Sequence, residues 1–342
     1  DIEIDEKDPN KFISVVKSIS TTFGGINLED IKAPEAFRIE RELINDLDIP
    51  VMHDDQHGTA IISAAALLNA LELVNKKIEN VKIVVSGAGA AAIACTKLYI
   101  SFGAKLQNIV MTDSKGVINK SRTGLSDEKK FFITKRKINS LEEAMEKSDV
   151  FIGLSMANIL SKKMLASMSK DPIVFAMANP DPEIDYNTAM SVRDDIIFAT
   201  GRSDLPNQVN NVLGFPFIFR GALDVRATKI NEEMKKAAVI ALAELAKKPV
   251  PEQVNIAYDE TKLLFGKDYI IPKPFDPRLI SEIPPAVAKA AMESGVAQEP
   301  ITDWDKYTQI LDERLGNNQK LIRIIHRRAR KAKNKKVVFA EA

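Results

Sequence analysis

Four acidic side chains in two short stretches could bind a metal ion. VMHDDQHGTA holds Asp54 and Asp55 next to each other, and FGGINLED ends in Glu29 and Asp30. Four carboxylates that converge without a cation would repel one another. Hard oxygen ligands suit Mg²⁺ or Mn²⁺, which keep positions open for water or substrate oxygens. The two stretches therefore predict a divalent-metal site if the fold brings them together.

A simpler interpretation of the paired aspartates is helix capping. An Ala- and Leu-rich run at 59–74 follows Asp54 and Asp55 and predicts a buried helix. An acidic residue just before a helix satisfies free N–H groups and favours the helix dipole, but this needs only one of the two. His53 and His57 could bind a transition metal, although each fits better as a polar neighbour.

The residues from Gly87 to Ala92 form a G-x-G-x-x-A pattern between an apolar β-branched run and an apolar helix-like run. The first glycine permits a tight turn, the second lets backbone approach a pyrophosphate, and the small sixth residue lets helix and strand pack closely. The helix N-terminus offers N–H groups to phosphates. This context predicts a dinucleotide site; the alternative is glycines that only relieve crowding.

The choice between NAD and NADP is open on the residues alone. Asp113 ends the next apolar run about 20 residues beyond the glycine pattern, where an acid binds the cofactor ribose and disfavours a 2′-phosphate. Ser114 and Lys115 follow directly, and a hydroxyl with an ammonium could receive that phosphate.

Amides in two further stretches could contact a ligand. Asn179 follows an apolar run in AMANPDPE, and Asn210 with Asn211 lies in PNQVNNVLGFP. Asn-Pro most often marks only a turn. In an open parallel sheet, however, ligands lie beyond the carboxyl ends of the strands, where Asn179 is expected. Both stretches could reach a nicotinamide or a substrate carboxylate.

The order of elements predicts an α/β fold with a doubly wound, Rossmann-like parallel sheet, because helical segments separate the apolar runs. Ser140 and Glu143 match a capping box at the start of a short helix. Residues 202–224 carry too many Pro, Asn and Gly for a regular element, and 231–245 predicts an amphipathic helix. The expected strands are at 81–86, 108–113, 149–155, 172–180 and 195–200.

Composition names no macromolecular partner. The net charge is +1 with 28% charged residues, which gives no overall attraction to nucleic acid, and no apolar run reaches membrane-spanning length. The basic stretch 323–336 lacks interleaved aromatic residues and favours a solvated connector. One cysteine, Cys95, rules out an internal disulfide and fits the cytoplasm.

Several long motifs together resemble the bacterial NADP-dependent malic enzymes. They include FGGINLEDIKAPE, HDDQHGTA, GAGAAAIAC, TDSKGVI, FAMANPDPE, ATGRSDLPNQVNNVLGFPFIFRGALD and DYIIPKPFDPR, in the family's order. The resemblance runs from about Asp1 to Ala297 and is closest to the long hybrid type, which carries a phosphate acetyltransferase-like region. The segment DIEIDEKDP is typical of a strand end and a turn, and the chain is expected to be truncated at both ends.

The resemblance implies a role for each matching residue. Glu29, Asp30 and Asp55 match metal ligands, and Asp54 matches an acid that supports the catalytic base. Asn179 and Asn211 match amides that contact substrate or nicotinamide. The expected cofactor contacts are Thr59, Gly87, Ala88, Gly89, Ala90, Ala91, Ala92, Asp113, Ser114, Lys115 and Asn179. The family's catalytic tyrosine and lysine motifs do not occur in this sequence and are expected upstream of it.

The implied activity is oxidative decarboxylation of L-malate to pyruvate and CO₂, with Mg²⁺ or Mn²⁺ and with NADP favoured over NAD. The expected units are the remainder of a catalytic N-terminal domain (1–55), a cofactor-binding domain (56–297) and a connector with the start of the acetyltransferase-like region (298–342). A cytoplasmic homo-oligomer without nucleic-acid or membrane partners is expected. The alternatives are a non-catalytic cofactor- and metal-binding unit and a metal-independent amino-acid dehydrogenase on a similar fold.

Overall fold

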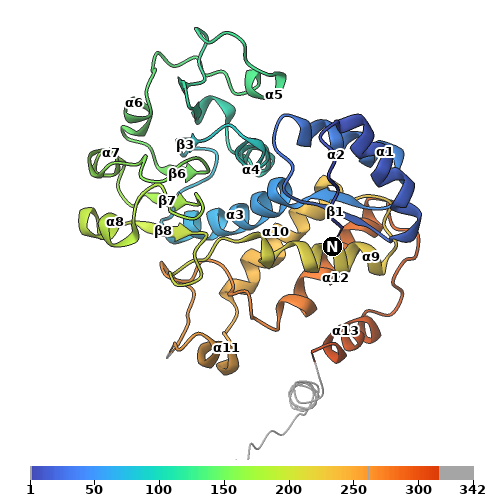
Figure 1. Cartoon of the computed structure of the whole chain (residues 1–342). Coiled ribbons are helices and arrows are strands. Elements are labelled where there is room, and N and C mark those ends of the chain that lie inside the picture. Colours follow the sequence, from blue (N-terminus) through green and yellow to red (C-terminus); the bar gives the residue numbers. More distant parts are fainter. Residues whose placement is uncertain (1, 261, 316–342) are drawn as a thin grey trace, which may run out of the picture.

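A computed structural model describes residues 2–260 and 262–315 of the chain (Figure 1). A small N-terminal unit packs beside a larger α/β unit built on a central sheet. Within the described ranges, no helix has both the length and the apolar character that a bilayer crossing requires.

Six strands form the central sheet in the order β5-β4-β3-β6-β7-β8. All neighbours pair in parallel except β4 and β5, which are antiparallel. This arrangement confirms the predicted doubly wound sheet, since each of the five expected apolar runs contains one strand. The strands are β3 Ile83–Ser86, β4 Ile109–Asp113, β5 Gly116–Val117, β6 Val150–Gly153, β7 Ile173–Ala176 and β8 Ile197–Thr200.

Alternate strand residues enter two separate cores because successive side chains point to opposite faces. Ile83 and Val85 of β3 join a large core, whereas Val84 joins a smaller one. Both faces are therefore buried, as expected for a parallel sheet covered by crossover helices. The small core includes residues of α6 Leu141–Met145, α7 Lys162–Ala166 and α8 Tyr186–Val192. Ser140 and Glu143 make the predicted capping box of α6.

The other face is covered by longer helices, which Figure 1 shows on the side of the sheet nearer the N-terminal unit. They are α3 Asp54–Leu73, α4 Ala90–Ser101, α9 Phe215–Asp224, α10 Glu232–Lys247 and α12 Leu279–Glu293. Two of them, α3 and α4, come from runs rich in Ala, Leu and Ile and are buried over most of their length, whereas the other three bury one face. The short helices α5 Asp127–Lys130 and α11 Glu252–Ala257 lie on outer loops.

The helix predicted from residue 59 begins five residues earlier than expected. His53 is its N-cap residue and makes no side-chain capping bond, while Asp54 and Asp55 occupy the first turn. Acidic side chains are favoured throughout the first turn as well as at the cap. The two aspartates are therefore inside α3, and neither acts as the N-cap of the simpler interpretation.

The prediction that residues 202–224 lack regular structure is wrong for their last ten residues, which form α9. Pro216 lies at the second position of this helix, where a missing N–H costs nothing. Gly221 lies inside it because an added Cβ would come within 2.6 Å of the Pro284 carbonyl oxygen of α12. The close packing of α9 against α12 therefore requires glycine at position 221. In the sequence, the same glycine was one of the residues that indicated an irregular segment.

The N-terminal unit consists of α1 Pro9–Ile19, β1 Ile26–Leu28, α2 Glu35–Asp46 and β2 Val51–His53. β1 and β2 pair in parallel as a separate two-stranded sheet. Residues 2–8 form no strand, so that expectation is wrong; Asp8 instead caps α1 through its side chain.

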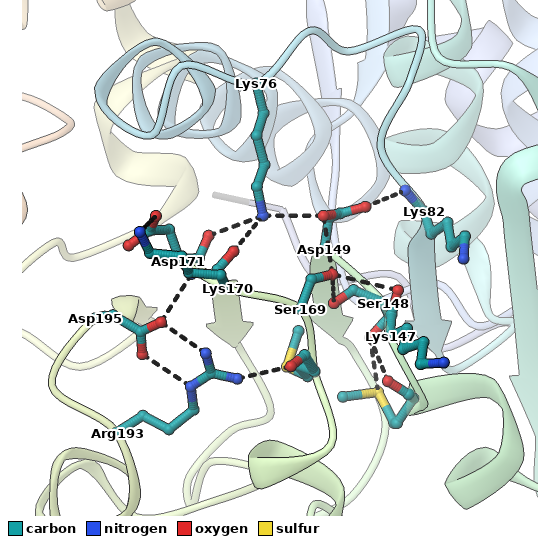
Figure 2. A network of polar contacts seen from close by, with 12 residues as sticks. Lys76, Lys82, Lys147, Ser148, Asp149, Ser169, Lys170, Asp171, Arg193 and Asp195 are labelled. Carbon is teal, nitrogen blue, oxygen red and sulfur yellow. Dashed lines mark hydrogen bonds and ion pairs between the residues drawn. The ribbon is translucent and has the colours of Figure 1, made fainter.

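Charged side chains join the amino ends of the central strands, at the edge opposite the glycine turn (Figure 2). Asp149, just before β6, accepts hydrogen bonds from Lys76 Nζ and the Lys82 backbone N–H, both at 2.9 Å. Asp195, before β8, accepts from the Asp171 backbone N–H at 2.8 Å and from the Arg193 guanidinium. These bonds fix the strand starts relative to one another.

The described part of the C-terminal segment contains α13 Trp304–Glu313. Tyr307 of this helix donates a hydrogen bond to Asp224 at the end of α9. The predicted basic connector at 323–336 and the apolar run at 335–342 lie outside the described residues.

Candidate functional site

The two acidic stretches meet because β1 and β2 are parallel neighbours. Leu28 pairs with His53, so the residues that follow each strand emerge at the same edge. The backbone N–H of Asp30, a residue with a positive φ of 58°, donates to Asp55 Oδ2 at 2.9 Å. The structure thus joins Asp30 and Asp55 directly, although they are 25 residues apart.

Asp54 is fully buried, and the segment after β8 supplies its partner. Asn211 Nδ2 donates to Asp54 Oδ2, whereas Asp54 Oδ1 has no hydrogen-bond partner among the described residues. Burial and the nearby charge of Glu29, and to a smaller extent that of Asp55, raise the pKa of Asp54 to about 7; the Asn211 hydrogen bond opposes them. A Cβ on Gly58 would overlap Asp54 Oδ1, so this position needs glycine.

The donor chemistry of these acids fits a hard divalent cation. An unpartnered buried carboxylate oxygen and a pKa raised partly by neighbouring carboxylates mark an excess of negative charge that a cation would offset. The ligand side chains are not gathered, however: the described ranges hold no group of three or more His, Cys, Asp or Glu arranged around a common point. Glu29 instead accepts a hydrogen bond from Asn27 at 2.7 Å. The ligand set Glu29, Asp30 and Asp55 stays a prediction.

Three ionisable side chains, Glu40, His57 and Lys235, contact one another in turn next to the acidic loops. Sequence reasoning missed this arrangement. Glu40 of α2 accepts from the His53 backbone N–H at 2.8 Å and contacts His57 Nε2 at 3.1 Å. On its other side His57 Nδ1 lies 3.2 Å from Lys235 Nζ of α10. Burial and the Lys235 charge lower the pKa of His57 despite the Glu40 carboxylate. His53 and His57 are thus polar neighbours, as favoured from the sequence.

The cofactor turn has the geometry that its glycines predict. Gly87 adopts a φ of 116°, and a Cβ there would lie 2.4 Å from the Leu154 carbonyl oxygen, too close for any other residue. Gly89 is the N-cap residue of α4, which has no capping side chain and no acid in its first turn. A Cβ on Gly89 would meet nothing within 4 Å. The open side of the turn and the free helix N-terminus fit an approaching pyrophosphate.

Asp113, the expected ribose ligand, is held by two basic side chains. Arg122 Nη2 and Lys129 Nζ lie 3.0 and 3.1 Å from its Oδ2, and the Lys115 backbone N–H donates to Oδ1 at 2.9 Å. Burial raises the pKa of Asp113, but these hydrogen bonds outweigh it and lower the pKa to about 2. Two cations beside one anion leave a net positive charge at the end of β4.

Glu183 is a second residue that sequence reasoning missed. Its side chain is fully buried and accepts hydrogen bonds from the backbone N–H groups of Ser155 at 3.1 Å and Ala178 at 3.0 Å. It therefore fixes the carboxyl ends of β6 and β7 beside the glycine turn. Gly153 is required here, since its Cβ would overlap the Glu183 carboxyl group. The only sequence signal was its place in the quoted motif FAMANPDPE.

The remaining predicted contacts differ in exposure. Asn179 is exposed directly after β7, and Thr59 is half-buried on α3. Ser114 and Lys115 are exposed after β4. Within the turn, Ala88 and Ala92 are buried while Ala90 and Ala91 are half-buried.

Family models match both units of the chain. The model for the malic enzyme NAD-binding domain matches residues 56–259, and the model for the malic enzyme N-terminal domain matches residues 3–44.

Named relatives and a solved structure give the same result. An NADP-dependent malic enzyme of Haemophilus influenzae is 54% identical over 343 residues, which are 100% of this chain and 45% of the relative. One from Halomonas elongata is 55% identical over 300 residues, 88% of this chain and 71% of the relative. The crystal structure of Entamoeba histolytica malic enzyme has a TM-score of 0.82 at 36% identity, and the match covers 96% of this chain and 67% of that one.

The chain therefore spans less than half of the Haemophilus relative and most of the Halomonas one. The family matches over both units agree with the structure, which has two paired acidic loops and a glycine turn at the carboxyl edge of a parallel sheet. The chain belongs to the malic enzyme family.

Proposed function

We propose that the protein containing this chain catalyses oxidative decarboxylation of L-malate to pyruvate and CO₂ with reduction of NADP. The observation that carries this proposal is the hydrogen bond from Asn211 to Asp54. It connects the end of the N-terminal unit, where the two acidic stretches meet, to the segment that follows β8 of the cofactor sheet. Membership of the malic enzyme family argues against the amino-acid dehydrogenase alternative.

Glu29, Asp30 and Asp55 would hold Mg²⁺ or Mn²⁺, with Asp55 kept in place by its bond to the Asp30 backbone. When bound, the cation would ease loss of the malate hydroxyl proton and polarise the ketone that forms. The protein would hold malate with C2 facing the nicotinamide, which accepts the hydride when NADP is bound.

Asp54 is the catalytic-site acid that the chain itself supplies, and we assign it the support of the catalytic base. Its fixed position favours this role: Asn211 holds one carboxylate oxygen, Gly58 leaves room for the other, and burial excludes water. Asn179 and Asn211 are proposed to contact substrate or nicotinamide. The family's tyrosine and lysine motifs do not occur in these 342 residues, and we propose that the whole protein supplies them.

NADP is proposed over NAD because of the charge around Asp113. An unpaired carboxylate there would repel a 2′-phosphate, but Arg122 and Lys129 neutralise it and leave donors nearby. Lys115 and Ser114 add an ammonium and a hydroxyl on the exposed side. The glycine-turn residues from Gly87 to Ala92, together with Thr59, complete the proposed cofactor contacts.

We propose the same division of the chain as its sequence predicts, with a catalytic N-terminal part to residue 55, a cofactor domain to 297 and a connector from 298. The family matches at 3–44 and 56–259 support the first boundary. A homo-oligomeric, cytoplasmic protein is proposed on the family resemblance and on the single buried cysteine.

The test compares Asp55→Ala with the unchanged sequence in the whole protein. The variant should lose Mn²⁺-dependent malate oxidation by at least about 10³-fold while its NADP dissociation constant stays within a few-fold, because Asp55 is assigned to the cation and not to the dinucleotide. Loss of cofactor binding together with activity would instead indicate a folding role. Full activity in EDTA would refute the metal-dependent reaction.

A further inference from the structure

A cavity of about 550 Å³ lies apart from the glycine turn and the acidic loops. Its walls come from residues 203–206 after β8, from residues within 258–260 and 262–269 after α11, and from Tyr186 and Lys273. No residue assigned to malate, metal or cofactor lines it. A cavity of this size can hold a small organic ligand.

Lys273 is the feature that distinguishes this cavity. The residue is only 7% exposed, yet its ammonium makes no hydrogen bond or ion pair with any described residue. It lies 5.2 Å from the centroid of the Tyr258 ring, over the cavity wall. Burial lowers the pKa of Lys273, and the charge of Glu260 opposes this effect. Because Lys273 lines the cavity, the donors of its ammonium are available to an anion there.

The surroundings of Lys273 are fixed in place. The Phe275 backbone N–H donates to the Tyr258 hydroxyl at 3.2 Å, which orients the ring below the ammonium. Buried Asn207 ties the two cavity walls together, because its Nδ2 donates to the carbonyls of Phe198 and Lys267 and its Oδ1 accepts from the Ile270 N–H.

The other charges of the wall are already engaged or exposed. Asp204 pairs with Arg202, and Lys267 Nζ reaches the Asp194 carbonyl at 3.4 Å. Glu260 is exposed at the rim. Lys273 is therefore the cation with unused donors at the buried end, while Leu205, Pro206, Leu263 and the tyrosine rings offer apolar contact.

We propose that this cavity is a second ligand site, which binds a small organic anion through Lys273 and packs the anion's apolar body against Tyr258 and the neighbouring leucines. A carboxylate and a phosphate satisfy the same ammonium, and an aromatic or branched body fits the walls.

Calorimetric titration of the whole protein with phenyl phosphate and with benzoate tests the site. Binding of at least one is expected, and the tighter of the two identifies the anionic group. Lys273→Met should weaken that binding about 10- to 100-fold, as loss of a charge-assisted contact does. Benzyl alcohol, which has the ring without the charge, should bind at least about 10-fold more weakly than the better anion.

Two control variants test whether the loss of anion binding is specific to Lys273. Lys262→Met removes an exposed cation that lines the same cavity, and Arg122→Met removes a cation of the proposed cofactor site; both should leave the binding within about two-fold. The thermal midpoint of Lys273→Met should equal or exceed that of the unchanged protein, because an unpaired buried charge is removed.

Binding that survives Lys273→Met, or that falls equally with Arg122→Met, would overturn the proposal. So would the absence of binding by both anions at millimolar concentration. A clear fall in the thermal midpoint of Lys273→Met would mark the lysine as a structural support and contradict its assignment to a ligand.

Discussion

Asn211 Nδ2 donates a hydrogen bond to Asp54 Oδ2 across 157 residues of sequence. Asn211 begins a 3₁₀ turn, η3 Asn211–Leu213, that follows the last strand of the cofactor sheet, whereas Asp54 begins α3 at the edge of the N-terminal unit. This contact directly links the acidic loops to the segment that follows the cofactor sheet.

Replacing Asn211 with Leu should lower kcat/KM for malate about 10- to 100-fold. The reason is that Asp54 loses the hydrogen bond that holds it and that lowers its pKa, so the carboxyl group turns and its pKa rises further. Steady-state kinetics measure the loss, and the NADP dissociation constant should change less than three-fold. Asn210→Ser is the matched control, since serine can keep the cap that Asn210 provides to the Val212 N–H. Unchanged kcat/KM in Asn211→Leu would contradict the role of the contact.

Removing either cation beside Asp113 should weaken the preference for NADP. Arg122→Met and Lys129→Met each uncover part of the Asp113 charge and remove a donor from the proposed 2′-phosphate position. The ratio of NADP to NAD affinities is expected to fall about 10-fold or more in each variant. Lys130→Met is the control, because Lys130 pairs instead with the exposed Asp127. Equal losses of NADP and NAD affinity would show that neither cation recognises the 2′-phosphate of NADP.

The ion pairs at the amino ends of the strands should make stability depend on acid pH. The Arg193 hydrogen bonds, against a smaller effect of burial, lower the pKa of Asp195 to about 2 from 3.8. A lowered folded-state pKa stabilises the protein above about pH 4, and this contribution disappears as pH falls through about 2. Asp195→Asn should therefore cost about 1–2 kcal/mol at pH 7, after allowance for partial solvation, and much less at pH 2.

Urea unfolding at the two pH values measures this difference. Asp127→Asn, which removes an exposed carboxylate, should leave the free energy of unfolding unchanged at both pH values, because solvent screens exposed ion pairs. NADP affinity should be unaffected in Asp195→Asn, because Asp195 precedes the amino end of β8 whereas the glycine turn follows the carboxyl end of the parallel strand β3. A cost that is equal at pH 7 and pH 2 would rule out the ionised carboxylate as its source.

The local patterns of the chain were enough to predict the parallel strands of the central sheet and the glycine turn, but not the short antiparallel strand β5. Each of the five predicted strands is a short apolar run bounded by polar residues, and Gly87 adopts a positive φ that few other residues tolerate. Where the prediction failed, packing between distant segments decided the structure. Gly221 is in α9 because α12 crosses close to it, and nothing near residue 221 in the sequence reveals that crossing.

The supporting charges of the site were beyond sequence reasoning for the same reason. Glu40, His57 and Lys235 come from three helices, and their contact depends on how α2, α3 and α10 pack. Glu183 gave no signal of its own because a buried carboxylate and a surface carboxylate look alike in sequence. By contrast, the meeting of the two acidic stretches could be predicted, since both carry an unusual density of carboxylates.

The proposed reaction requires that the two acidic loops hold a divalent cation beside a dinucleotide bound at the Gly87 turn. Crystals of the whole protein grown with Mn²⁺ and NADP, measured at the manganese absorption edge, test it most directly. One anomalous peak is expected at coordination distance from carboxylate oxygens of Glu29, Asp30 and Asp55, with the cofactor pyrophosphate at Gly89. A manganese peak elsewhere, or none with the cofactor bound, would contradict it.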